Sequence, residues 1–583
     1  MKIIKGIAGI ARSIKSAYKR FPLPLILAAL SGVLLIILNE IGYNENAPGE
    51  NISRLIMVFM LGVPITLSIK LIWERRGEAK PALRLSAYGL SALFLTMYYF
   101  LLLRELEMVS IVRYAAISFM FYLIAACITC WFGRKNYEMY IIRIFSRFLI
   151  TGIFALVMFL GVAGILASID GLLEINVPSK AYLYTFYVIG TFFVPSYAFA
   201  GIPLSCSELD EAKYPKSLCV LLLYIMVPII SAYTAILYLY FVKVLVERTW
   251  PQGMVGNLVL WYSLVSIVVI FFMTPVIQEK KWVKGFVFWF TKLILPCIII
   301  LFISMGIRIK AYGVTESRYF VVLAGLWALG IFIYWNVRGT NHNIILPVSL
   351  AVVLLISTAG PFSAFEVSIR SQSSRLESIA ESYGMLQEGK LKPVDGTISD
   401  KDRSTIKSIL QYFKNNHSLS DIEYLPEGFK MEDTNQYFGF NIYDSYDNDS
   451  SIISFYYNSK NGNVTDIRGF DYLVSLSGGK NDGQEERFGD SYTAGYSSNN
   501  KSVVIYNGKT QIYSFNVGSF AEELNKEYNE KDYNIPQDRM TIEEDNEDLS
   551  VRIVISDLIG EIYNSSNNLE INNMTCQVYV RIK

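Results

Sequence analysis

The chain has 583 residues, of which 52% are hydrophobic and only 18% charged, and its mean hydropathy is +0.35. These values exclude a disordered chain, a disulfide scaffold and an ordinary cytosolic enzyme. The formal net charge of +1 hides two opposite parts. Residues 1–360 carry 31 Lys and Arg against 16 Asp and Glu, whereas residues 361–583 carry 21 against 35. We therefore expect a membrane part joined to an acidic, water-soluble part.

Residues 1–20 predict a basic amphipathic helix rather than a removable signal peptide, because the basic region is long and no small-residue cleavage site follows. Apolar side chains recur at helical spacing, and Lys and Arg lie largely on the other face: Ile3, Ile7, Ile10, Ile14 and Tyr18 form the apolar stripe. Such a helix lies on an anionic membrane surface. A basic topology anchor without a specific lipid partner explains the pattern equally well.

Residues 21–361 predict a transmembrane helical domain. A helix needs about 20 apolar residues to cross a hydrocarbon core roughly 30 Å thick. About eleven runs meet this requirement, near residues 21–41, 54–73, 83–103, 109–132, 146–169, 182–204, 217–243, 254–277, 286–306, 318–335 and 343–361. The fold class is therefore a polytopic α-helical membrane protein followed by a C-terminal soluble domain.

The basic residues of the short loops predict the orientation of these spans, because Lys and Arg are retained on the cytoplasmic side. Alternate loops place 21 Lys and Arg on the side of the N-terminus and 9 on the other side. We expect a multi-pass protein of the bacterial cytoplasmic membrane with its N-terminus inside. An odd number of spans then places the C-terminal part outside.

Residues 362–416 predict a helical connector. Apolar residues recur at helical spacing over 366–386, and Ser399 precedes a second helix with acidic residues in its first turn. Residues 417–583 predict a soluble, β-rich α+β domain that is large enough for its own core. Under the orientation above, this domain is extracellular.

The soluble part contains two hairpin signals, since Asn461-Gly462 and Asn507-Gly508 each separate two strand-like runs. Ser519, with Glu522 three residues later, is typical of a capping box and predicts a helix over 519–530. Closing strands are expected at 549–556 and 574–582.

The cysteines and acidic clusters predict neither a metal nor a cofactor. Cys576 is alone in the soluble domain, and an outside domain without disulfides points to a bacterial envelope. Cys127-Ile-Thr-Cys130 has redox or metal spacing, but it falls inside a predicted span, where thiols usually pack. Residues 444–449 resemble a calcium loop without its glycine and closing Glu. The acidic run 543–548 is more typical of a solvated turn.

Motifs for catalysis are sparse. Only two histidines occur, His342 and His417, which leaves little material for a zinc site or a catalytic triad. Every Asp and Glu of residues 1–360 falls in a loop or at a span end, which argues against a proton- or sodium-coupled carrier. Prolines inside the spans could free backbone carbonyls to line a cavity, although kinks that serve packing explain them as well.

Four segments have a distinctive order and spacing. They are Arg20-Phe-Pro-Leu-Pro, the stretch from Pro228 to Gly253, Arg308-Ile-Lys-Ala-Tyr312-Gly-Val-Thr315-Glu-Ser-Arg318-Tyr319, and Gly360-Pro-Phe-Ser363 with Val367-Ser368, Ser371-Gln372 and Arg375-Leu376. Together they resemble the bacterial membrane family called domain of unknown function 4153, over about residues 20–415. The resemblance implies a polytopic bacterial membrane protein, and it supplies no reaction and no catalytic residue.

The last two of these segments are expected to meet at the outer surface, because a single inside loop separates them. Trp250-Pro251, in another outer loop, would join them. Their basic and polar side chains suit an anion such as a lipid phosphate or a glycan carboxylate. The alternative is that they dock the acidic soluble domain onto the membrane part. The candidate residues are Arg308, Tyr312, Thr315, Arg318, Ser363, Ser368, Arg370, Gln372 and Arg375.

Three classes of function remain. A non-enzymatic sensor, scaffold or ligand-binding protein of the envelope is preferred, because no missing motif counts against it. A transporter or lipid exporter fits the many spans but lacks an energy-coupling residue. A membrane glycosyl- or phospholipid-transferase would need an acidic residue in a sizeable first outer loop, here only about residues 42–53 with Glu45 and Glu50. The expected partners are the lipid bilayer and an anionic lipid or cell-wall glycan; no nucleic acid is expected, and no protein partner is indicated.

Overall fold

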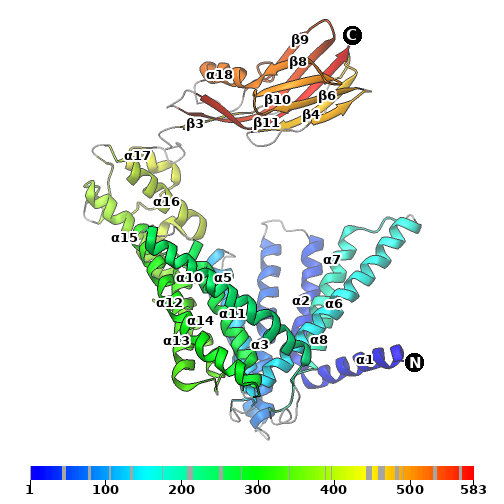
Figure 1. The fold of residues 1–583 in the computed structure, drawn as a ribbon, viewed down its shortest axis with the longest axis vertical. Coiled ribbons are helices and arrows are strands. Elements are labelled where there is room, and N and C mark those ends of the chain that lie inside the picture. Colours follow the sequence, from blue (N-terminus) through cyan, green and yellow to red (C-terminus); the bar gives the residue numbers. More distant parts are fainter. Residues whose placement is uncertain are drawn as a thin grey trace. The chain divides into compact units, whose positions relative to one another are not determined.

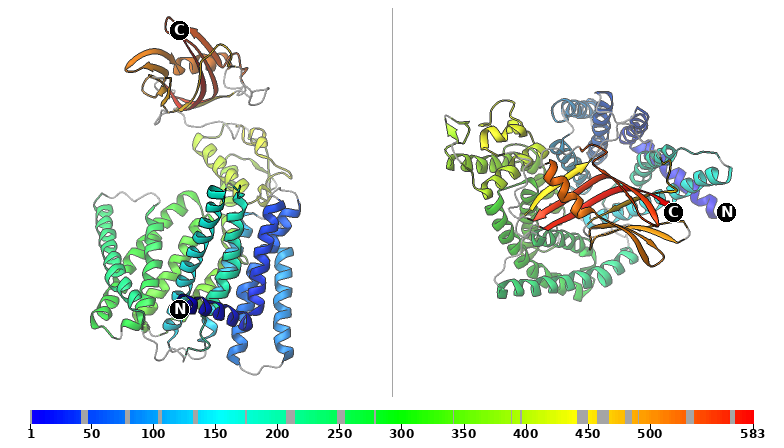
Figure 2. Two further views of the ribbon diagram at one scale, coloured as in Figure 1. Left: turned by 90° about the vertical axis from the view of Figure 1, so that its right-hand side faces the viewer. Right: turned by 90° about the horizontal axis from the view of Figure 1, so that it is seen from above.

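The structure is a computed structural model that divides into two compact units (Figures 1 and 2). Unit 1 comprises residues 1–395 and 406–430, and unit 2 comprises residues 396–405 and 431–583. The structure describes residues 2–41, 47–76, 81–103, 107–131, 136–173, 175–206, 214–247, 254–277, 279–340, 342–387, 389–394, 397–440, 450–456, 467–479, 485–489, 491–528, 535–563 and 568–583.

Unit 1 is built from long apolar helices. In chain order they are α1 (Lys2–Arg20), α2 (Pro22–Ile41), α3 (Ala47–Arg76), α4 (Pro81–Leu101), α5 (Met108–Ile128), α6 (Tyr137–Leu173), α7 (Ser179–Val188), the π-helical turn η1 (Ile189–Phe193), α8 (Val194–Phe199), α9 (Lys216–Val220), the π-helical η3 (Leu221–Met226), α10 (Val227–Glu247), α11 (Met254–Ile277), α12 (Lys281–Tyr312), α13 (Glu316–Arg338) and α14 (Ile345–Thr358). An apolar run in a bilayer must satisfy its backbone internally, which explains why each predicted run coincides with helical backbone.

The count of eleven spans is not confirmed. Eight helices in the described part of the chain are long and apolar enough to cross a membrane. The remaining predicted runs coincide with α4, with the segment α7–η1–α8 and with α14. α14 has only 14 residues. α4 is more polar because it contains Arg84 and several Ser and Tyr residues. The π-helical turn η1 interrupts the segment α7–η1–α8.

The ends of several helices of unit 1 meet beside α1. Arg20, at the end of α1, pairs with Glu74 near the end of α3 (2.9 Å). Its guanidinium also donates to the carbonyl of Ile202, just after α8. The Tyr140 hydroxyl, near the start of α6, donates to Thr129 Oγ1 after α5 (2.9 Å). Figure 1 shows α1 at this end of the helices, crosswise to α2, and α15 at the opposite end.

Arg147 lies within α6, near the start of the apolar run predicted over residues 146–169. Its guanidinium carbon is 3.6 Å from the centroid of the Tyr197 ring, and its Nε donates to the Tyr197 carbonyl (3.0 Å). A Cβ on Gly201 would lie 2.3 Å from Arg147 Cγ. The absence of a side chain at Gly201 therefore makes room for this arginine, and the aromatic ring and carbonyl replace water around its charge.

Cys130 was expected to pack as a free thiol, but it forms a disulfide with Cys206. The Cα atoms of the pair are 5.7 Å apart, and both residues are buried. The disulfide links the end of α5 to the segment after α8. Cys127 remains a buried free thiol, 3.8 Å from the Tyr137 hydroxyl.

The predicted connector consists of two helices and a short hairpin. α15 spans Ala364–Ser382 and α16 spans Asp400–Asn416, with the two-residue strands β1 (Leu386–Gln387) and β2 (Lys390–Leu391) between them. Ser399 caps α16 as predicted, because its Oγ accepts a hydrogen bond from the Asp402 amide (3.3 Å). Within unit 1, α15 packs against α13 and α14.

Unit 2 holds two antiparallel sheets. After α17 (Thr434–Phe438), the strands are β3 (Ser450–Tyr456), β4 (Tyr472–Gly478), β5 (Glu485–Phe488), β6 (Tyr492–Ser497), β7 (Ser502–Asn507), β8 (Thr510–Asn516), β9 (Thr541–Asp545), β10 (Leu549–Tyr563) and β11 (Asn568–Ile582), with helix α18 (Val517–Tyr528) after β8. One sheet has the order β3-β10-β11-β4 with β9 also on β10, and the other is β5-β6-β7-β8. Both sheets contribute to one core, with Val503, Ile553, Val578 and Leu524 among its members.

The local signals in unit 2 have mixed outcomes. The hairpin at 507–508 is confirmed, since Asn507 pairs with Thr510. The Asn461-Gly462 turn lies outside the described residues, but β3 pairs with β10 and not with β4. Part of the acidic run 543–548 is strand β9 rather than a turn, because Glu543 and Glu544 pair with β10. The calcium-like residues 444–449 also lie outside the described part.

Candidate anion-binding site

The candidate site begins at the loop between α12 and α13. Gly313 ends α12 with φ of +70°, and its amide donates to the Ile309 carbonyl (2.8 Å). A Cβ at this position would lie 2.8 Å from Gln372 Nε2, so both the backbone and the close approach favour glycine. Thr315 precedes α13 with extended backbone, and its side chain makes no capping hydrogen bond.

Helix α15 holds this loop in place. Gln372 Nε2 donates to the carbonyls of Tyr312 (3.0 Å) and Val314 (2.9 Å), and the Val314 amide donates to Ser371 Oγ (2.8 Å). Gln372 is buried, so its hydrogen bonds are shielded from water. Ser363 caps α15 by accepting from the Glu366 amide (3.4 Å). The structure thus brings together the two motif segments that were expected to meet.

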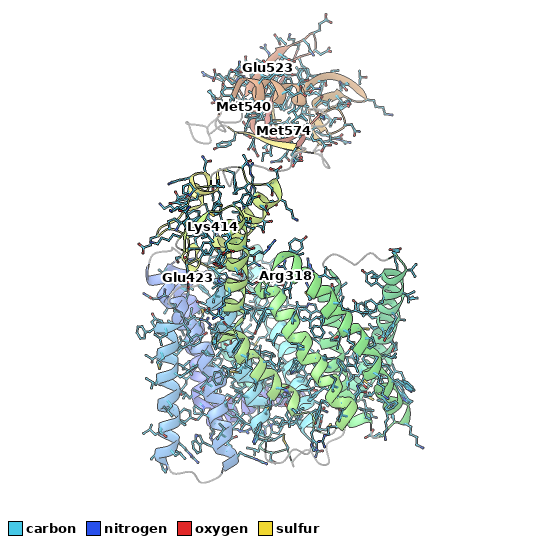
Figure 3. All side chains as sticks on the ribbon, turned by 90° about the vertical axis from the view of Figure 1, so that its left-hand side faces the viewer. Arg318, Lys414, Glu423, Glu523, Met540 and Met574 are labelled. Carbon is cyan, nitrogen blue, oxygen red and sulfur yellow. A yellow bond between two sulfur atoms is a disulfide. The ribbon has the colours of Figure 1, made fainter. Side chains whose placement is uncertain are left out.

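Arg318 lies at this loop, within electrostatic reach of two other arginines. Arg318 donates to the carbonyls of Tyr312 (3.1 Å) and Gly313 (2.7 Å), and its guanidinium lies 5.5 Å from the Tyr312 ring centroid. The positive charges of Arg308 and Arg375 both act on Arg318. Figure 3 labels Arg318 together with Lys414 of α16 and with Glu423, which follows α16. Positive charge therefore accumulates between α12, α13 and α15.

Two of these arginines have no carboxylate partner within the described part of the chain. Among the residues that the structure describes, the ion pairs include neither Arg318 nor Arg375. Partial burial lowers the pKa of the Arg375 guanidinium, and the nearby Tyr312 hydroxyl opposes this shift. A half-buried cation that lacks a counter-charge favours binding of an anion.

A buried polar cluster joins the connector to the start of α13. Glu316 Oε1 lies 2.5 Å from His417 Nε2 and accepts a hydrogen bond from the Tyr412 hydroxyl (2.5 Å). Tyr412 Oη is 3.1 Å from His417 Nε2. The side chains of Glu316 and His417 are only 5% and 3% exposed. Burial and the bond to Glu316 raise the pKa of Tyr412, which therefore keeps its proton and donates.

Ser368 lies next to this cluster. The residue is fully buried, and its Oγ is close to the Tyr412 hydroxyl without forming a hydrogen bond of good geometry within the described structure. An orphan hydroxyl in a buried position has capacity for a further partner.

Not every predicted residue belongs to the site. Arg370 is exposed on α15, and Trp250-Pro251 lies outside the described residues. Conversely, sequence reasoning missed Glu316, Tyr412 and His417. Two sequence signals could have pointed to these residues: Glu316 lies inside the motif from Tyr312 to Tyr319, and histidine is scarce in the chain. Neither signal indicates that Glu316 contacts His417, which is 101 positions away.

The pattern of the family described as "Domain of unknown function (DUF4153)" matches residues 25–384. The chain belongs to this family. The match contains both segments of the candidate site and all helices from α3 to α14.

One curated relative of this DUF4153 chain is "Uncharacterized protein PM1469" of Pasteurella multocida (strain Pm70), which is 26% identical over 238 residues. The aligned region covers 40% of the chain and 40% of that relative. No solved structure matches the chain. The comparisons therefore support the family and a membrane protein with apolar helices, and they assign no reaction.

Proposed function

We propose that the protein is a non-enzymatic receptor or scaffold of the bacterial cytoplasmic membrane that binds the phosphate of an anionic lipid. The observation that carries this proposal is that Arg375 lies within electrostatic reach of Arg318 and that, in the described structure, no ion pair includes either arginine. Guanidinium groups match phosphate oxygens in geometry and charge. The loop lies where a membrane-spanning helix begins, which is the depth of lipid headgroups.

Binding at this loop would also reach the connector. Gln372 and Ser371 hold the loop from the same helix that presents Arg375. A headgroup bound by Arg318 and Arg375 would therefore stabilise the packing of α15 against α13. The outer placement of the C-terminal domain, inferred from the loop charges, would then make that domain the part that meets an envelope partner.

The test compares the two arginines of the site, Arg318 of α13 and Arg375 of α15, with the exposed Arg370 of α15. Purified protein in detergent is titrated with phosphatidylglycerol and, separately, with phosphatidylcholine, and the melting temperature is followed. A ligand at about 100 times its Kd stabilises the folded state by roughly 2.7 kcal/mol. We expect this increase with phosphatidylglycerol for the native protein and for Arg370→Gln, but not for Arg318→Gln/Arg375→Gln.

Other outcomes separate the alternatives. Equal stabilisation by both lipids, of which only phosphatidylglycerol has a net negative charge, would contradict the preference for an anionic lipid. An unchanged response of the double variant would contradict the site itself. A response to inorganic phosphate alone would identify a soluble anion as the ligand, and a response only to an acidic glycan would favour the cell wall. If Arg375→Gln loosens the C-terminal domain without changing any ligand response, the docking alternative is correct.

A transporter or lipid exporter is the second candidate, favoured by the π-helical segments η1 and η3 in the membrane part. Such irregular turns are frequent at functional sites and allow a helix to change its packing. Reconstitution into vesicles that contain a fluorescent phospholipid tests this role. Faster exchange of the lipid between leaflets than in protein-free vesicles would support it, and an unchanged rate would exclude lipid movement under those conditions.

A further inference from the structure

Unit 1 contains an apolar cavity of about 510 Å³ between α2, α3, α5, α6 and the segment η1–α8. Its volume lies within the range of roughly 300–1,000 Å³ that is typical of small-molecule sites. Thr191, Tyr122 and Tyr140 contribute the hydroxyl groups of a lining that is otherwise apolar. The Thr191 and Tyr140 hydroxyls already donate to Tyr187 and Thr129, so little polar capacity remains for water.

The cavity lies in the half of the helices near α1. Leu71 lines it close to the end of α3, Tyr140 close to the start of α6, and Ile202 just after α8. Hydrogen bonds of Arg20 and between Tyr140 and Thr129 connect these helix ends to one another beside α1. The arginine cluster described above lies at the opposite end, beside α15.

The cavity is accessible from the side of the helices. Phe119, Tyr122 and Phe148 line it and are 50%, 38% and 44% exposed. These residues belong to α5 and α6, which are both long and apolar enough to span a membrane. The opening of the cavity therefore faces the acyl chains of phospholipids rather than water.

Helix α1 adds a basic surface next to the cavity. The buried residues Ala17 and Phe21 attach it to the cavity wall, where the Phe21 and Phe199 rings are 6.1 Å apart, centroid to centroid. Lys15 and Lys19 remain exposed on α1. An amphipathic helix with exposed Lys is attracted to anionic headgroups at the membrane surface.

We propose that this cavity binds an acyl chain of an anionic phospholipid from the leaflet on the side of α1, whose headgroup lies against α1. The cavity wall includes the π-helical turn, at Gly190 and Thr191, and Pro195, which has no amide hydrogen to donate. Without a side chain at Gly190, an acyl chain can lie directly against this turn. The site is independent of the arginine cluster, so either proposal can fail alone.

Two glycines provide a matched test. A Cβ at Gly190 would meet nothing within 4 Å, so Gly190→Leu fills the cavity without a clash at its first atom. Gly161 on α6 is equally open and exposed but does not line the cavity, so Gly161→Leu is the control. Both changes replace a glycine in helical backbone by leucine.

The probe is phosphatidylglycerol with a photoreactive diazirine near the end of one acyl chain, incorporated into vesicles with the full-length protein. Labelled peptides are identified by mass spectrometry. We expect labels on the cavity residues of α5 and η1–α8 in the native protein and in Gly161→Leu. In Gly190→Leu these labels should fall by about tenfold, since burial of about two methylene groups already corresponds to that factor in affinity.

Unchanged labelling in Gly190→Leu would overturn the proposal. If Gly190→Leu fails to fold, the positions of the labels in the native protein test the proposal. Labels confined to the outward faces of α4 and α6, as expected for any boundary lipid, would then overturn the proposal. The same experiment with a phosphatidylcholine probe tests the headgroup. Equal labelling by both probes would contradict the anionic preference, and weaker labelling by phosphatidylcholine would support it.

Discussion

At the scale of single residues, the strongest prediction concerns His417. Its imidazole lies beside the buried carboxylate of Glu316, which also accepts a hydrogen bond from the Tyr412 hydroxyl. His417→Ala removes one partner of a buried charged group, and the expected cost is about 2 kcal/mol. Because the contact joins the connector to α13, we expect faster hydrogen–deuterium exchange in residues 406–416, the end of α16.

The other histidine of the chain is the control. His342 is exposed and lies outside this cluster, so His342→Ala should leave the exchange of α16 unchanged. Equal exchange in the native protein and His417→Ala would show that the Glu316 contact does not hold the connector. Tyr412→Phe is expected to have an intermediate effect, since it removes one hydrogen bond and leaves the Glu316–His417 contact.

At the scale of elements, two residues, Asn516 and Ser519, are candidates for the N-cap of α18. The sequence favoured Ser519, whereas in the structure the Ser519 amide donates to Asn516 Oδ1 (2.8 Å), and α18 begins at Val517. Asn516→Ala should therefore destabilise unit 2 by about 1 kcal/mol, as is usual for loss of a side-chain cap. Ser519→Ala should have almost no effect, and the reverse order would contradict the assignment.

Cys576 offers a way to compare the stability of unit 2 between the Asn516→Ala and Ser519→Ala variants of the full-length protein. The thiol is buried in the core of unit 2, and burial raises its pKa to about 12. At about pH 8.5, where a free thiol is half ionised, it reacts with an alkylating agent only after unfolding. Because the folded state disfavours the thiolate, the stability of unit 2 should fall as the pH rises from about 8.5 towards 12.

These elements also show how much could be predicted from the sequence. Apolar length and period predicted the helices, since hydrocarbon permits little else. The order of the loops predicted that the segments of Tyr312 and Gln372 would meet at one surface, but not the hydrogen bond between these two residues. The pairing of β3 with β10 was not predictable, because an Asn-Gly turn indicates only local partners. The Glu316–His417 contact and the cavity depend on packing between distant segments, for which no local pattern exists.

At the scale of the whole molecule, two observations bear on the orientation in the membrane. Within unit 1, α1 and α15 lie at opposite ends of the helices, which agrees with an odd number of crossings between them (Figure 1). The loop charges favour the N-terminus inside. Against this, the Cys130–Cys206 disulfide lies at the end near α1, and disulfides are rare on the reducing, cytoplasmic side of a membrane.

The last prediction links these observations in one experiment. Two reporters are fused after Lys583, one active only outside the membrane and one fluorescent only inside, and the thiols are trapped in intact cells. We expect activity from the outside reporter together with trapped thiols at Cys130 and Cys206, because the reducing cytoplasm opens a disulfide that lies on its side of the membrane. A Cys130→Ser variant assigns the labelled peptides. Signal from the inside reporter together with an intact disulfide would instead place α1 outside and the C-terminal unit in the cytoplasm. The acyl-chain cavity would then open to the outer leaflet, and the arginine cluster would face inner-leaflet headgroups.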